Sequence, residues 1–148
     1  MKKVFSIGLV SLFLVGCDKT VTKEMLVGDW KCEAIEYKST WDGNNFGEFT
    51  INGTHEISIK FKNKNNSFYV QKQDDNKWRE ANDFLDEFTN ETKTFEGDDS
   101  IAKSTKSLRK INDNKFLIIE ERENIEKYDK DSFNNRKNKI EVTCNRIK

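Results

Sequence analysis

LVGDWKCEAIEY, residues 26–37, is the stretch that decides how this chain folds. Trp30, Cys32 and Ala34 fall on one side of it, and mostly charged residues fall on the other. Successive side chains of a β-strand point to opposite faces, so this period of two predicts a strand. A matching strand is predicted at residues 139–147, where one face carries Ile140, Val142, Cys144 and Arg146.

The N-terminus predicts export. Lys2 and Lys3 precede an uncharged, mostly apolar run at residues 4–15, which is too short to span a bilayer and is typical of a secretory signal. The run ends in Leu14-Val15-Gly16-Cys17, which resembles the lipobox of bacterial lipoproteins. The alternative is an ordinary signal peptide with an incidental cysteine.

The lipobox resemblance implies a location and a division of the chain. It implies diacylglycerol on the Cys17 thiol, cleavage before Cys17 and acylation of the new N-terminus. Residues 1–16 would be the lipoprotein signal peptide, 17–24 the lipidated tether and 25–148 a single β domain. The expected location is the bacterial cell envelope, with the lipid in the inner or the outer membrane and the domain facing the periplasm.

Two further cysteines, Cys32 and Cys144, lie near the two ends of the domain. In an exported protein such a pair most simply forms a disulfide. A metal site or a nucleophilic thiol is the alternative, but the chain has one histidine, which argues against a Cys/His zinc site. No metal and no cofactor are expected.

A disulfide across an antiparallel pair would set the register of the first and last strands. Opposed residues would then have numbers that add to 176, which places Trp30 opposite Arg146. A guanidinium over an indole ring is a favourable cation–π contact. We therefore predict a structural Trp30–Arg146 pair on the same face as the disulfide.

Gly28-Asp29-Trp30 resembles the Gly-x-Trp signature of lipocalins, in which the tryptophan packs against an arginine from the end of the barrel. Arg146 is placed for that role. The resemblance implies an all-β, mostly antiparallel fold, a small lipocalin-like barrel or sandwich. Pairing the first strand with the last would close the meander and remove exposed edges.

The middle of the chain predicts further strands and one ambiguous segment. Asn52-Gly53 is a hairpin-type dipeptide, and a second turn is predicted at residues 63–66. The segment 73–90 has near-helical spacing and predicts a short amphipathic helix around 78–89, although a long loop or an irregular strand pair also fits. Strands are expected at residues 46–51, 55–62, 67–72, 91–96, 101–111 and 115–122.

Composition bounds the function. The 148 residues carry 26 basic and 26 acidic side chains, a balance that argues against nucleic acid as a partner. The 11 Phe and 3 Trp place the chain outside the disordered class. No nucleophile comes with a matching base, and no phosphate-binding loop is present, so we expect no enzyme.

The sequence therefore predicts a non-catalytic binding or accessory module, and two classes of partner stay open. Trp41, Trp78 and Phe84 either form an exposed binding surface or plug the barrel mouth. An inhibitor or immunity-type protein would use such a surface to bind a toxin, hydrolase or other envelope protein. A carrier would instead hold a small apolar ligand in a cavity lined by side chains such as Phe61, Phe68 and Phe116.

Overall fold

The computed structural model describes residues 20–147, apart from 74, 76 and 130–133. The signal peptide predicted at 1–16 and the lipidation site at Cys17 lie outside these residues. Within them, no helix is long and apolar enough to cross a bilayer.

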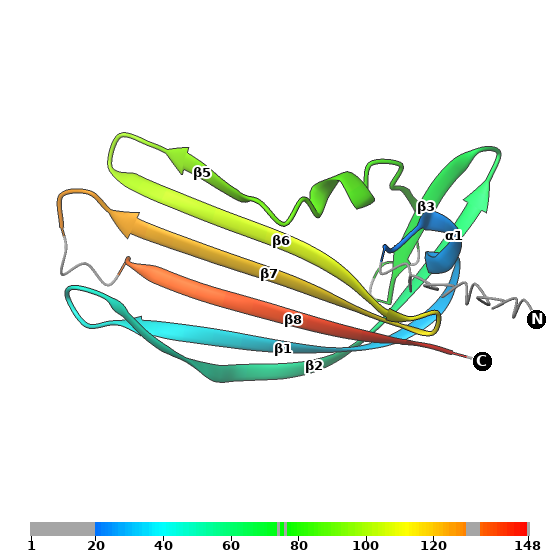
Figure 1. The fold of residues 1–148 in the computed structure, drawn as a ribbon, viewed down its shortest axis with the longest axis horizontal. Coiled ribbons are helices and arrows are strands. Elements are labelled where there is room, and N and C mark those ends of the chain that lie inside the picture. The colour runs from blue at the N-terminus through cyan, green and yellow to red at the C-terminus, as the bar shows by residue number, and fades with distance from the viewer. Residues whose placement is uncertain (1–19, 74, 76, 130–133, 148) are drawn as a thin grey trace, which may run out of the picture.

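Eight antiparallel strands form one sheet in the order β4-β3-β2-β1-β8-β7-β6-β5, which curls into a barrel-like half-cylinder (Figure 1). This confirms the all-β antiparallel fold class. A short helix precedes the first strand, and a 3-10 turn lies between the fourth and the fifth. The elements are α1 (Lys23–Leu26), β1 (Gly28–Trp41), β2 (Phe46–Lys64), β3 (Ser67–Lys72), β4 (Arg79–Glu80), η1 (Leu85–Glu87), β5 (Thr92–Glu96), β6 (Ser100–Asn112), β7 (Lys115–Glu126) and β8 (Arg136–Arg146).

The first and last strands pair in the predicted register. Cys32 lies opposite Cys144 and forms a disulfide with it, and Trp30 lies opposite Arg146. We call the sheet face that carries these residues the inner face. It is also the face of the buried Phe61 and Phe116, so the disulfide lies inside the main core.

The sheet is not closed, contrary to the expectation that pairing the first and last strands would complete a barrel. Its edges are β4, a strand of 2 residues, and β5, a strand of 5 residues. Between them, the described residues of the segment expected to hold a helix or a strand pair form only β4 and the 3-residue turn η1. Its apolar side chains, Ala81, Phe84 and Leu85, pack against the core instead of extending a strand ladder.

Asn52-Gly53 does not form the predicted hairpin turn. Residues 46–64 are one continuous strand, β2, because the long strand β1 provides a partner from Phe46 to Phe61, on both sides of Asn52-Gly53. Glu36 pairs with Gly53 and Tyr37 with Ile51, so Asn52 is the extra residue of a bulge. The predicted turn after β2 is confirmed: Asn65 and Asn66 have φ values of 52° and 62°, the left-handed conformation of a tight hairpin.

Arg146 closes one end of the half-barrel. Its guanidinium carbon lies 4.3 Å from the centroid of the Trp30 ring, which confirms the predicted pair. The same guanidinium donates to the carbonyl oxygens of Met25 and Val27, and Trp30 Nε1 donates to the Leu26 oxygen at 2.7 Å. One arginine and one tryptophan therefore tie α1 to the first and last strands.

Gly28 makes this closure possible. Its φ is 131°, a region that side-chain-bearing residues rarely adopt. A Cβ at this position would lie 2.6 Å from Arg146 Nη1, which is too close for any contact. The glycine of Gly28-Asp29-Trp30 thus leaves space for the arginine that covers the tryptophan.

Candidate functional site: an open groove on the inner face

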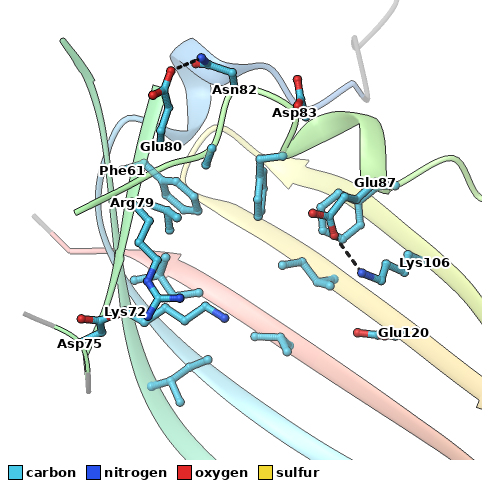
Figure 2. Close-up of a pocket in the computed structure, with 18 of the residues that line it drawn as sticks. Phe61, Lys72, Asp75, Arg79, Glu80, Asn82, Asp83, Glu87, Lys106 and Glu120 are labelled. Atoms are coloured by element: carbon cyan, nitrogen blue, oxygen red, sulfur yellow. Dashed lines mark hydrogen bonds and ion pairs between the residues drawn. The ribbon is translucent and has the colours of Figure 1, made fainter. Parts of the chain in front are cut away.

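A groove of about 970 Å³ lies on the inner face of the half-barrel, beside the core (Figure 2). Its floor is apolar and comes from four strands, β2, β3, β7 and β8. Inner-face residues alternate with outer-face ones along each strand, and the floor is made of inner-face residues. The floor consists of Ile57, Ile59, Phe61, Val70, Ile118 and Val142.

The segment between β4 and β5 forms one wall of the groove. Two hydrogen bonds attach it to β3: Ala81 N donates to the Phe68 oxygen, and Phe68 N donates to Asn82 Oδ1, both at 2.8 Å. Phe84 then turns inward, with its ring centroid 5.4 Å from that of Phe61. The side chains that failed to form a strand are therefore the ones that bound the groove.

The acidic side chains around the groove are already engaged or turned away. Glu87 accepts from Lys106 at 2.8 Å on the far wall. Glu120, on the floor, accepts from Arg122 Nε at 2.6 Å. Glu80 accepts from Asn82 at 2.5 Å and faces it in Figure 2, away from the floor. Asp83 also points away from the floor in that view.

The basic side chains of the opposite wall have fewer acidic partners. Lys72 and Arg79 reach into the groove from β3 and β4 (Figure 2). Arg79 pairs with Asp75 at 2.5 Å. Lys72 and Lys77, which also line the groove, have no ion pair among the residues that the structure describes. The groove thus has an apolar floor and, at one side, two lysines without an ion pair among the described residues.

The predicted aromatic surface does not form as one patch. Trp41 packs on Phe46 with 4.9 Å between ring centroids, at the β1–β2 hairpin and at the opposite end of β1 from Phe61. Trp78 is 36% exposed and its ring is covered by Lys62 Nζ at 3.8 Å. Only Phe84 of the three lines the groove.

The three phenylalanines named for a cavity also separate. Phe61 lines the groove, whereas Phe68 and Phe116 are fully buried in the core and do not reach it. Phe116 packs edge-on against Trp30, with 4.7 Å between centroids. The end of the half-barrel near α1 is therefore filled, and the open space lies beside it.

Lys72 and Arg79 were missed by the sequence reasoning. The signal for Lys72 was present, because the strand predicted at 67–72 puts Phe68, Val70 and Lys72 on one face. Nothing in the sequence indicated β4, whose two residues carry Arg79.

Within the described residues, no group of three His, Cys, Asp or Glu side chains is arranged to hold a metal ion. A scan against models of protein families finds no match to the chain, and neither does a search of curated proteins. The groove and its charges are therefore the basis for assigning a function.

Proposed function

We propose that this protein is a lipid-anchored lipoprotein of the bacterial cell envelope whose domain faces the periplasm and binds a small amphipathic molecule in the inner-face groove. The protein acts as a non-catalytic binding module, a carrier of its ligand. Anchoring rests on the lipobox resemblance at Cys17, and ligand binding rests on the groove.

The observation that carries the proposal is an apolar floor open to solvent within a volume of about 970 Å³. Small-molecule sites fall at roughly 300–1,000 Å³ and are mostly apolar with a few placed polar groups. Exposed apolar surface costs free energy, about 25 cal/mol per Å², and a ligand that covers the floor recovers it. An apolar molecule with one polar end matches this lining.

The position of the groove suits a carrier at a membrane. α1 lies beside β3, since Lys23 Nζ is 5.9 Å from the Phe68 ring and Leu26 is in the same core cluster. A tether from Cys17 to Thr22 spans at most about 20 Å when fully extended. Lipid on Cys17 would therefore keep the groove close to the bilayer surface.

A protein partner is the second candidate, as an inhibitor or immunity-type protein would have. The observation that favours it is β5, an edge strand in which all five residues, Thr92–Glu96, are exposed. Phe95 is 59% exposed there. A free strand edge with an exposed aromatic can pair with a strand of another protein.

Three variants of the protein test the proposal. Native mass spectrometry of the Cys17→Ser protein, purified gently from periplasm, should show an added mass that denaturation removes. Val142→Phe should fill the groove floor and abolish that mass. Thr143→Phe, the next residue on the opposite face of β8, is the matched control and should retain it.

A bare mass in all three proteins would count against the carrier and favour the protein partner. Anchoring is tested separately, because the wild-type protein should partition into detergent and Cys17→Ser should not.

A further inference from the structure

We infer that the groove takes a single-chain amphiphile with a carboxylate head, a fatty acid, and that Lys72 binds the carboxylate. This inference rests on the function proposed above and adds the chemical class of the ligand to it. The observation behind it is a lysine on the inner face at the end of an apolar row.

The register places Lys72 where a ligand head group would lie. Phe68, Val70 and Lys72 point to the inner face of β3, so the row changes from apolar to cationic. Lys72 is opposite Ile59 of the groove floor, and Arg79 is opposite Val70. An acyl chain on the floor therefore has two cationic side chains beside one of its ends.

The charges around the groove favour an anion at that end and nowhere else. Glu87 and Glu120, on the far side, are each held by a basic partner. Asp83 also lines the groove and has no ion pair among the described residues, but its carboxylate points away from the floor in Figure 2. At the β3 side, Arg79 is paired with Asp75, whereas Lys72 has no ion pair among the described residues.

A single negative charge fits this arrangement better than a double one. Of the two groove lysines without an ion pair among the described residues, Lys72 reaches into the groove in Figure 2, and the carboxylates of Asp75, Glu87 and Glu120 also line it. A dianionic phosphate would meet more repulsion from these groups than a carboxylate. A charge-assisted hydrogen bond from an ammonium to a carboxylate is also about twice as strong as a neutral one.

Lys72 has an alternative role, protection of the sheet edge, which the experiment must distinguish from ligand binding. Inward-pointing lysines near a sheet edge hinder pairing with other chains. β3 is next to the edge strand β4, so Lys72 could act in this way without any ligand. A purely protective lysine would affect association and stability, but not the choice between two ligands.

Isothermal titration of the Cys17→Ser protein with decanoate and with decanol provides the test, because the two share a chain and differ in head-group charge. With the groove otherwise unchanged, this protein should bind decanoate about tenfold more tightly than decanol, a difference of about 1.4 kcal/mol in binding free energy. Lys72→Gln should remove that preference and leave decanol binding unchanged. Lys72→Arg should keep it. Lys64→Gln, on β2 outside the groove, is the matched control and should behave as wild type.

The outcomes separate the inference from the function. Equal binding of both probes in every variant would overturn the carboxylate assignment and leave the apolar groove standing. A preference for decanoate that survives Lys72→Gln would overturn the role of Lys72. Binding of neither probe would overturn the proposed carrier function together with this inference.

Discussion

Loss of the Cys32–Cys144 bridge should destabilise the domain strongly, because the bridge joins residues 112 positions apart in the sequence. It lies between the first and last strands, which pair from Trp30–Arg146 to Ser39–Lys137. In the unfolded chain the bridge closes almost the whole domain into one loop. Breaking it lets the unfolded state gain conformational entropy while the folded pairing stays the same.

The magnitude follows from the loop length. The chain-entropy relation gives about 16 cal/mol/K for a loop of this size, which is about 5 kcal/mol at 25 °C. Native domains have total stabilities of about 5–15 kcal/mol, so the bridge could account for a large part of the margin. With a urea m value of about 2 kcal/mol/M, the unfolding midpoint should fall by roughly 2–3 M.

Urea denaturation of the same protein, with and without a reducing agent added in the unfolded state, isolates the cross-link. Cys32 and Cys144 are buried, at 1% and 0% exposure, and reduction breaks the bridge without removing either sulfur atom. A Cys32→Ala/Cys144→Ala double variant adds the loss of the sulfur atoms and should be less stable still. A reduced protein that unfolds within about 1 kcal/mol of the oxidised one would refute the reasoning.

Three further predictions concern packing and charge. Trp30→Ala should cost about 3–5 kcal/mol, because the side chain is fully buried and its loss leaves a cavity. Gly28→Ala should cost about 1–3 kcal/mol, since its φ of 131° is strained for alanine and the new Cβ meets Arg146. Burial opposes the ionisation of Glu123, but hydrogen bonds from Lys103 and Lys137 outweigh it and lower its pKa. Glu123 therefore stabilises the fold above its ordinary pKa of 4.5 and loses this effect as the pH falls through its folded value, and Lys137→Met should reduce the loss.

Each of these three predictions has a control variant or an outcome that would contradict it. Trp41→Ala, at the half-exposed hairpin, should cost less than Trp30→Ala in the same urea titration. Gly47→Ala should be tolerated, because its Cβ would make an ordinary 3.6 Å contact, and equal losses at both glycines would contradict the packing argument. If wild type and Lys137→Met lose stability equally below pH 4.5, the contact of Lys137 with Glu123 has no part in the acid response.

The ends of the domain could be predicted well. Alternation in residues 26–37 and 139–147, with one cysteine in each, was enough to give the strand pairing, the disulfide and the Trp30–Arg146 contact. These features depend on local period and on one covalent constraint, both visible in a single sequence. The hairpin at Asn65-Asn66 was also predictable, because those residues favour the left-handed conformation that a tight turn requires.

The middle of the chain was less predictable because its structure depends on distant partners. Asn52-Gly53 has the composition of a turn, yet β1 pairs with the strand on both sides of it and makes it a bulge. Residues 73–90 have helical spacing, yet their apolar side chains pack on β2 and β3. Local propensity in both places was weaker than a long-range contact that no local pattern encodes.

The sequence alone thus determined the strand periodicity, the antiparallel pairing of the two ends and the expectation of export and lipid attachment. Only the tertiary structure decided that the sheet stays open between β4 and β5 and leaves a groove beside a filled core. Whether a barrel closes depends on whether its two edge strands can reach each other, which depends on the curl of all eight strands together. The position of Lys72 over an apolar floor has the same origin, since register across three strand pairs, and no local motif, brings that lysine to the groove.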